Sequence, residues 1–367
     1  MCGIMGVVGT EPAVPILIDG LQHLSYRGYD AAGIAVFDGN RIDIRKTAGH
    51  LDRLRTLLDG QPVHGSIGIG HTRWATHGAP TDVNAHPHTD ATERIAVVHN
   101  GIIENEQVLR ARLAAEGVVF RSQTDTEVIA HLIGRQLEKG MHRALRDTLS
   151  MLTGAYALVV LCADEPDRIY AVRKDSPLVI GLGDGAQYLA SDIPALLPHT
   201  RDVVLLEDGD IAMLTRKGLT IWDRNDRLTA REEKKINWNQ DAADKGEHDH
   251  FMRKEIDEQP EAFERLMRSP VAELPDAKSI SMVACGSAYH AGMAGQFYFG
   301  KFAALPAEVA IASEFRYRPA LLNASSLCMA ISQSGETADT LAALRSAKAQ
   351  GAHAAAVVNV QDSSIAR

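Results

Sequence analysis

The sequence predicts two regions of different fold class, α+β up to about residue 223 and α/β from residue 276. In the first region, short apolar runs typical of β-strands outnumber amphipathic helices, which favours antiparallel sheet with helices packed on it. In the second region, apolar strands and helices alternate regularly, which is typical of a parallel sheet covered on both faces. The strongly charged residues 224–275 between them are predicted to form a connector that includes at least one solvated helix. A chain of 367 residues is long enough for two such cores.

The elements of the first region follow from hydrophobic periodicity. Its strand-like runs are AGIAVFD, SIGIGHTR, RIAVVHNG, AYALVVLCA and DIAMLT. One helix is predicted after Asn105 and another in TDTEVIAHLIGRQLEKG, where Thr124 or Asp125 can cap the first turn. Apolar residues at positions 128, 129, 132 and 133 recur there with helical spacing.

The second region repeats a strand–turn–helix unit. The predicted strands are SISMVACG, SSLCMAISQSG and HAAAVVNV, and the predicted helices are SAYHAGMAGQFYFGKF and TADTLAALRSAKAQG. A parallel domain of this kind normally needs about five strands. The chain ends after roughly four, so we expect an incomplete domain.

Composition excludes several classes of function. The net charge of −9 and the absence of a basic cluster argue against a nucleic-acid partner. No apolar run approaches the ~18 residues of a membrane helix, and the N-terminus lacks a signal-peptide pattern, so a cytoplasmic protein without a membrane partner is predicted. The four cysteines lie far apart without a C-x-x-C pair, which fits reduced thiols.

The chain opens MCGIMGVVG, with a thiol at position two. If Met1 is removed, Cys2 becomes the first residue and its thiol sits beside a free α-amine whose pKa lies near 8. A nucleophile with a built-in base is one way to activate a weak nucleophile. The alternative is a chance cysteine before a first strand.

HTRWATHG, residues 71–78, follows the apolar run SIGIG. Arg73 can clamp a carboxylate through two parallel hydrogen bonds, or it can belong to a surface salt-bridge cluster. A zinc site is a further alternative. Its four imidazoles would be His71, His77, His86 and His88. The spacing matches no zinc motif, so no metal is predicted.

Two further motifs have a functional and a structural interpretation. In HNGIIEN, the side chain of Asn100 and the N–H of Gly101 can direct two donors at one oxyanion, whereas an N-G pair alone is typical of a hairpin turn. In TDTEV, Asp125 can hold a substrate ammonium or simply cap a helix.

In the second region, ACGSAYH and SQSGET each end a buried strand and open a helix. Ligands of open α/β sheets bind at the carboxyl edge of the strands, and helix N-terminal amides suit a phosphate. The hydroxyls available there belong to Ser287, Ser332, Ser334 and Thr337.

Taken in order, these motifs resemble the glutamine–fructose-6-phosphate aminotransferase family, also called glucosamine-6-phosphate synthases. The motifs are MCGIMGVVG, LSYRGYDAAG, HTRWATHG, NAHPH, VVHNGIIEN, TDTEVIAHL, GAYAL, SPLVIGLG, EDGDIA, DKGEHDHFMRKEIDEQP, ACGSAYH, ASEFRYR and SQSGETADTL. The resemblance implies an α+β, four-layer αββα sandwich of the N-terminal-nucleophile hydrolase type over residues 2–223. It also implies a charged linker over 224–275 and an incomplete α/β sugar isomerase (SIS) domain over 276–367.

The resemblance also implies roles for individual residues. Cys2 attacks the glutamine side-chain amide, while Asn100 and Gly101 stabilise the oxyanion. Glutamine is held by Arg73, Thr76, His77 and Asp125. Arg27 lies near the nucleophile and Trp74 gates the ammonia passage. The residues implied to hold the sugar phosphate are Ser287, Ser332, Gln333, Ser334 and Thr337.

The implied reaction hydrolyses glutamine to glutamate and ammonia, which is transferred to fructose 6-phosphate to make glucosamine 6-phosphate. No cofactor is implied, and the full-length family is expected to be a homodimer. The C-terminal half of the family, with the Lys, Glu and His that act on the sugar, is absent from these 367 residues. Two alternatives are therefore a chain with glutaminase activity only, and a sugar-phosphate-binding module with an idle glutaminase.

Overall fold

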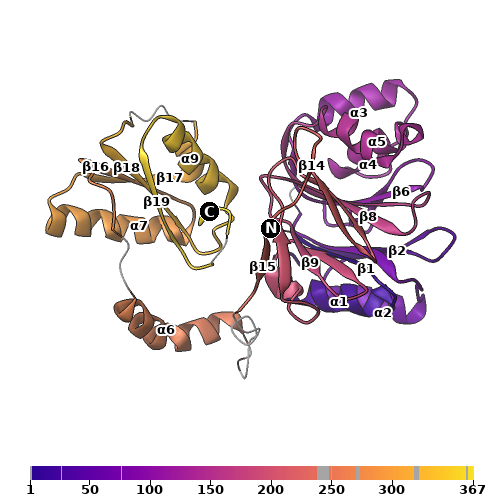
Figure 1. The fold of residues 1–367 in the computed structure, drawn as a ribbon, viewed down its shortest axis with the longest axis horizontal. Helices are drawn as coiled ribbons and strands as arrows, with labels where there is room; N and C mark the ends of the chain where they lie inside the picture. Colours follow the sequence, from indigo (N-terminus) through magenta and orange to yellow (C-terminus); the bar gives the residue numbers. More distant parts are fainter. Residues whose placement is uncertain are drawn as a thin grey trace. The chain divides into compact units, whose positions relative to one another are not determined.

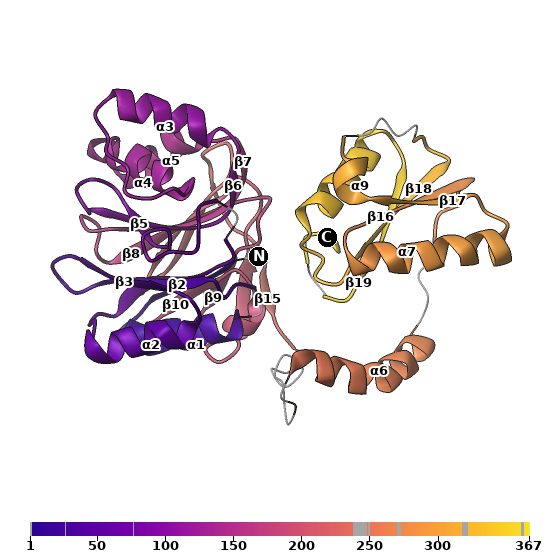
Figure 2. The same cartoon turned by 180° about the vertical axis from the view of Figure 1, so that it is seen from behind.

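The chain folds into two compact units, Met1–Glu247 and His248–Arg367, which are described separately (Figures 1 and 2). The computed structural model describes residues 2–25, 27–75, 77–237, 248, 250–269, 273–317, 322–360 and 363–367. Within these ranges, no helix is both long and apolar enough to cross a membrane.

The first unit contains two antiparallel sheets. The eight-stranded sheet has the order β15-β11-β9-β10-β1-β4-β2-β3, and the seven-stranded sheet has the order β14-β13-β12-β8-β7-β6-β5. The strands of the first sheet are β1 (Gly3–Val8), β2 (Ala31–Phe37), β3 (Ile42–Ala48), β4 (Ile67–Arg73), β9 (Val179–Leu182), β10 (Gln187–Ala190), β11 (Asp202–Leu205) and β15 (Glu233–Lys235). Those of the second are β5 (His88–Thr89), β6 (Ile95–Ile103), β7 (Gly154–Cys162), β8 (Arg168–Lys174), β12 (Ile211–Thr215), β13 (Gly218–Trp222) and β14 (Leu228–Thr229).

Helices cover the outer face of each sheet, so the first unit has four layers (Figure 1). The eight-stranded sheet is covered by α1 (Ala13–His23) and α2 (Leu51–Gly60). The seven-stranded sheet is covered by α3 (Glu106–Ala115), α4 (Thr126–Gly134) and α5 (Met141–Leu149). The described residues of this unit also include the short 3₁₀ helices η1 (Leu137–Lys139) and η2 (Ile193–Ala195). The predicted αββα sandwich is confirmed.

The central strands of the two sheets, such as β1 and β7, are largely apolar because side chains on both of their faces are buried. In β6, Ile95 and Val97 pack toward the helices, whereas Ala96 and Val98 pack between the two sheets. This is the two-residue alternation of a strand with an apolar layer on either side. The alternation fixes which side chains project into the space between the sheets.

The sheets of the first unit extend past the predicted boundary at residue 223. Strands β14 and β15 lie within the predicted connector but pair with β13 and β11 at the edges of the two sheets. Edge pairing uses backbone groups, so a polar, charged segment can form it without contributing to the core. The expected solvated helix is α6 (Phe251–Arg268). Residues 238–247, also in the connector, lie outside the described ranges.

The second unit is a four-stranded parallel sheet of order β17-β16-β18-β19. Its strands are β16 (Ser279–Ala284), β17 (Ala307–Ile311), β18 (Ser326–Ser332) and β19 (His353–Val358). Its helices are α7 (Ser287–Tyr298), the π-helical turn η4 (Phe299–Ala303), α8 (Ala312–Phe315) and α9 (Ala338–Ala349). The predicted β-α alternation is therefore confirmed.

Helices lie on both faces of this parallel sheet. Val283 of β16 and Ala330 of β18 pack with α8 and α9. Met282 lies on the opposite face, beside Gly295 of α7. The helices that follow the neighbouring strands β16 and β18 thus cover opposite faces, which creates a topological switch point between these strands.

Candidate active site

One end of the space between the two sheets collects most of the predicted glutaminase residues. The core between the sheets includes Ile4 of β1, Ile69 of β4 and Val98 of β6. Residues two or four positions from these project to the same side, because side chains of a strand alternate with period two. Those residues are Cys2, His71, Arg73 and Asn100. Strand alternation in three segments thus brings together residues from distant parts of the sequence.

A small pocket opens at this end of the sheets. Its lining residues are Cys2, Arg73, Trp74, His77, His86, His99, Gly101, Thr124, Asp125 and Thr126. Six of these were predicted from the sequence. Thr76, also predicted, lies outside the described residues. Asn100 and Arg27 contact the backbone of Cys2, so the structure places both beside the predicted nucleophile.

The thiol of Cys2 lines this pocket and is partly buried. Its Sγ accepts a hydrogen bond from the N–H of Trp74 at 3.3 Å. Burial raises the pKa of the Cys2 thiol above its ordinary value, more than the Trp74 amide and the nearby positive charges lower it. A thiol with a raised pKa is protonated at neutral pH, so it needs a base before it can attack.

The main chain of Cys2 is held from two sides. Its carbonyl oxygen accepts hydrogen bonds from Asn100 Nδ2 at 3.1 Å and from Arg27 Nε at 3.3 Å. Arg27 Nη1 also pairs with Asp192 at 2.7 Å. These contacts restrict the backbone that carries the thiol.

Asn100 and Gly101 lie within β6 rather than in a turn. They pair with Ala157 and Tyr156 of β7, so the hairpin alternative is wrong. Gly101 has φ +128°, and a Cβ there would lie 2.0 Å from the carbonyl oxygen of Ala155. The position therefore requires glycine, both for the backbone conformation and for the close approach of β7.

Asp125 immediately precedes α4, but its carboxylate makes no capping hydrogen bond to that helix. Its Oδ2 instead accepts a hydrogen bond from the N–H of Ile103 at 2.8 Å. This contact fixes the carboxylate at the wall of the pocket and links α4 to the end of β6. The helix-cap alternative is therefore wrong for the side chain, although the sequence position is that of a cap.

Arg73 uses its guanidinium to hold the loop after β4. Its Nη2 donates to the carbonyl oxygens of His77 and Gly78, and its Nη1 donates to that of Ala79 at 3.2 Å. Five N–H donors are available on a guanidinium, so these contacts leave donors for a carboxylate. The salt-bridge alternative does not describe Arg73, because its guanidinium donates to backbone carbonyl oxygens in the described part of the chain.

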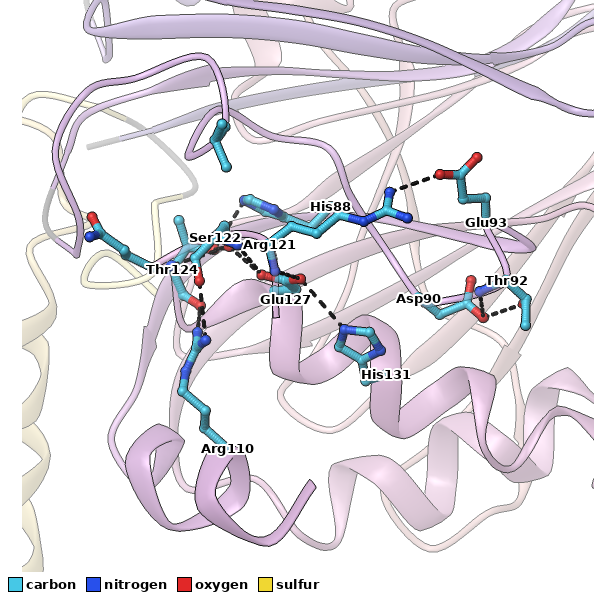
Figure 3. Close-up of polar contacts among 12 residues, drawn as sticks. His88, Asp90, Thr92, Glu93, Arg110, Arg121, Ser122, Thr124, Glu127 and His131 are labelled. Atoms are coloured by element: carbon cyan, nitrogen blue, oxygen red, sulfur yellow. Dashed lines mark hydrogen bonds and ion pairs between the residues drawn. The ribbon is translucent and has the colours of Figure 1, made fainter. Parts of the chain in front are cut away.

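Glu127 of α4 anchors the segment that leads into the pocket (Figure 3). Its carboxylate accepts hydrogen bonds from the N–H of Arg121 at 2.7 Å and from both the N–H and the hydroxyl of Ser122 at 2.6 Å. The Ser122 hydroxyl lies 3.1 Å from that of Thr124, which lies 3.0 Å from His88 Nε2. Glu127 thus stabilises the turn that carries Thr124 to the pocket.

Replacing Glu127 with glutamine is expected to destabilise the first unit in a pH-dependent way. Burial raises the pKa of Glu127, but hydrogen bonds from His131, Arg121 and Ser122 outweigh it and lower the pKa from 4.5 to about 2. The carboxylate therefore stabilises the fold fully above pH 4.5, by roughly 2–3 kcal/mol, and this contribution is lost as the pH falls toward 2.

Urea unfolding of both proteins at pH 7 and at low pH measures the effect. The exposed Glu93, whose carboxylate pairs with Arg121, provides the control, because Glu93→Gln should change stability little. Equal stability of the wild type and Glu127→Gln at pH 7 would contradict the assignment.

Three histidines of the zinc alternative, His71, His86 and His88, are buried and pack against one another. His71 and His86 stack with ring centroids 4.1 Å apart, and His86 lies 4.8 Å from His88. His86 Nδ1 accepts a hydrogen bond from the N–H of His99. Burial lowers the pKa values of His86 and His88 well below 6.5, so both are neutral at pH 7. Across the described ranges, no group of three or more His, Cys, Asp or Glu is arranged to hold a metal ion.

Sequence reasoning did not assign four pocket residues to the glutamine site: His86, His99, Thr124 and Thr126. All four lie inside or beside the motifs NAHPH, HNGIIEN and TDTEV. Their proximity to these motifs was the available signal. The direction in which these side chains point depends on how β6 and α4 pack against each other. A local motif contains no information about that packing.

In the second unit, the structure brings the two predicted phosphate turns to adjacent strands. Ala284 of β16 pairs with Ile331 of β18, so the turns after both strands begin side by side. Ser332 Oγ accepts a hydrogen bond from the N–H of Gly335 at 3.0 Å and lies 3.3 Å from Thr337 Oγ1. The other predicted residues of these turns are Ser287, Gln333 and Ser334. These turns lie at the carboxyl edge of the sheet, at the switch point.

Models of known domains match both units. The glutamine amidotransferase domain matches residues 71–198, and the SIS domain matches residues 273–367. Among curated proteins, the glutamine–fructose-6-phosphate aminotransferase [isomerizing] of Clostridium tetani is 48% identical over 382 residues. The protein of the same description from Symbiobacterium thermophilum is 49% identical over 383 residues. Each alignment covers 100% of this chain and 63% of the relative.

Over its whole length, the chain is similar to glutamine–fructose-6-phosphate aminotransferases. It spans 63% of the length of these aminotransferases and carries a glutamine amidotransferase domain followed by a SIS domain. Among solved structures, the Bacillus subtilis glutamine phosphoribosylpyrophosphate amidotransferase complexed with ADP and GMP aligns with a TM-score of 0.56 at 20% identity. That alignment covers 98% of this chain and 81% of the solved chain, and it supports the fold alone.

Proposed function

We propose that this chain hydrolyses glutamine to glutamate and ammonia, with Cys2 as the nucleophile. The observation that carries the proposal is one pocket lined by a thiol, a guanidinium and a carboxylate, from Cys2, Arg73 and Asp125. A free amino acid presents one carboxylate and one ammonium, and opposite charges in a partly buried pocket bind both. The names of the curated relatives support glutamine as that amino acid.

The reaction begins with the removal of Met1, which leaves a free α-amine on Cys2. The amine accepts the thiol proton while Sγ forms a bond to the amide carbon of the glutamine side chain. Asn100 Nδ2 and the N–H of Gly101 stabilise the negative oxygen of the tetrahedral intermediate. The α-ammonium returns its proton to the leaving nitrogen, and the C–N bond breaks to release ammonia and leave a thioester. Water then adds to the thioester, the C–S bond breaks, and glutamate and the thiol are released.

Glutamine is oriented by its own charges. Asp125 pairs with the α-ammonium, and Arg73, aided by His77, pairs with the α-carboxylate, while Trp74 covers the pocket and gates ammonia. Thr76 is included in this proposal on the family resemblance. The raised pKa of the thiol supports the need for the neighbouring amine as base.

Substituting Asp125 with asparagine tests this proposal. The variant loses one charge-assisted contact, worth about 1.5–3 kcal/mol, so we expect the KM for glutamine to rise about 10- to 100-fold. Glutamate release by the Met1-processed protein measures it. Asp59 on α2 is exposed, and Asp59→Asn should leave KM unchanged. A KM within twofold of the wild type in Asp125→Asn would contradict the binding role.

The second unit is proposed to bind fructose 6-phosphate through the turns after β16 and β18. Three features support this: the switch point between the strands, the hydroxyls gathered there and the SIS-domain match. Ser287 is followed by Ala288, so position 288 adds no hydroxyl to this turn. Transfer of ammonia to the sugar and the homodimer of the full-length family remain predictions.

Sugar-phosphate binding is tested by calorimetry on the whole chain. Ser332→Ala removes a hydroxyl from the phosphate turn and should weaken fructose 6-phosphate binding about 10-fold. Ser346→Ala, toward the far end of α9, should leave the affinity unchanged. Equal affinity of Ser332→Ala and the wild type would place the phosphate elsewhere.

A further inference from the structure

Beneath the proposed oxyanion site lies a histidine with no role in the proposed reaction. His71 of β4 is fully buried, and its Nε2 lies 3.1 Å from Asn100 Oδ1 and 3.0 Å from the carbonyl oxygen of His99. We infer that His71 is a positioning residue that orients the Asn100 amide toward the oxyanion. This inference rests on the glutaminase function proposed above.

The two ends of the Asn100 amide have different and complementary partners. The carbonyl oxygen of Cys2 can only accept a hydrogen bond, so the NH₂ end of the amide faces it, at 3.1 Å. The oxygen end then faces His71 Nε2. The orientation of the amide is therefore specified from both sides.

The proton of His71 is located by the same logic. Both groups near Nε2 are oxygens that accept hydrogen bonds, so Nε2 carries the proton and donates to them. The other ring nitrogen, Nδ1, is buried and has no hydrogen-bond partner in the described part of the chain. A neutral imidazole protonated at Nε2 fits these surroundings. In that tautomer Nδ1 carries no hydrogen, so no N–H donor is buried without an acceptor.

Burial also keeps the ring in this state. It lowers the pKa of His71 to about 3, so the ring is neutral across the working pH range. His71 is therefore a fixed donor and neither an acid nor a base in the reaction. The Asn100 NH₂ group has two hydrogens; one bonds to the Cys2 carbonyl, and the second is left for the substrate oxyanion.

Loss of the His71 donor should slow catalysis without weakening glutamine binding. The oxyanion forms after binding, so an amide free to rotate affects the transition state more than the ground state. We expect His71→Leu to lower kcat about 10- to 100-fold, with KM within about twofold and an unchanged shape of the pH profile. His71→Gln restores an N–H donor near the same position and should recover most of kcat.

A double-variant cycle separates positioning from a general structural effect. If His71 acts through Asn100, the His71→Leu/Asn100→Ala variant is no slower than Asn100→Ala alone. His199→Leu is the matched control. The His199 ring stacks on Tyr188 of β10, the strand that pairs with β1. In the described part of the chain, no contact joins His199 to Asn100. His199→Leu should retain the wild-type kcat.

The outcomes distinguish this inference from the function on which it rests. A wild-type kcat in Asn100→Ala defeats the oxyanion role and, with it, the inference. Two outcomes overturn the inference but leave the oxyanion role of Asn100 intact, provided that Asn100→Ala is slow. In the first, the His71→Leu variant is stable and has the wild-type kcat. In the second, the losses of kcat in the two single variants multiply in the double variant.

A measurement on the unmodified protein covers the case in which His71→Leu does not fold. In the ¹⁵N spectrum of histidine-labelled, Met1-processed protein, we expect His71 to be protonated at Nε2 between pH 5 and 9. Assignment of His71 is made by comparison with the His71→Gln spectrum. Protonation at Nδ1, or titration within this range, overturns the inference.

Discussion

Replacing Cys2 with alanine should reduce glutamate release from glutamine to the uncatalysed background. Among the described residues that line the pocket of the first unit, Cys2 is the only cysteine. Cys162 is buried in the core of the first unit, and burial raises the pKa of its thiol to about 11. Cys162→Ala is therefore the matched control, and we expect it to retain close to the wild-type rate.

Retention of Met1 should abolish the same activity while leaving the thiol intact. A peptide bond at Cys2 removes the amine that accepts the thiol proton, and desolvation of the partly buried thiol raises its pKa. Intact mass identifies processed and unprocessed samples, and glutamate release is measured on each. A Met1-retaining sample that turns over glutamine would show that another group acts as the base.

Substituting Gly101 with alanine should have the largest combined effect on stability and activity. The new Cβ would lie 2.0 Å from the Ala155 carbonyl oxygen, so β6 and β7 must separate beside the pocket. The residue would also keep an unfavourable φ of +128°. We expect the free energy of unfolding to fall by more than about 3 kcal/mol, and glutamate release to be lost because Asn100 moves with the strand.

Gly117 provides a control for the backbone conformation alone. It has φ +92°, but a Cβ there would meet nothing within 4 Å. Gly117→Ala should therefore cost only about 1 kcal/mol and leave the reaction rate unchanged. Urea unfolding and glutamate release measure both variants, and equal effects of the two substitutions would refute the close-contact argument.

Local pattern was enough to predict part of the secondary structure, including strands β2, β4, β6, β7 and β12, and to identify the chemical motifs. The apolar runs, the helix starts near Asn105 and Asp125 and the β-α repeats after Ser279 each depend on residues close in the sequence. Family resemblance added the four-layer architecture. Motif content also identified Cys2 and Arg73 as candidates, because few residue types can attack an amide or bind a carboxylate.

Motifs with two local interpretations were decided by long-range pairing. An Asn-Gly pair suits a hairpin, yet β7 continues alongside Asn100 and Gly101 and keeps both in a strand. Asp125 occupies a cap position, yet its carboxylate bonds to the N–H of Ile103 from β6. In both cases the deciding partner lies more than 20 residues away, so no local window contains it.

By itself, the sequence determined the order of the two units, the α+β and α/β classes and a set of candidate residues for the proposed chemistry. Only the tertiary structure decided how those residues face one another. It placed β14 and β15 at sheet edges, turned His71 toward Asn100 and held the Cys2 carbonyl between Asn100 and Arg27. The physical reason is that composition and periodicity set which face of an element is buried, whereas hydrogen-bond partners are set by which strands pack together.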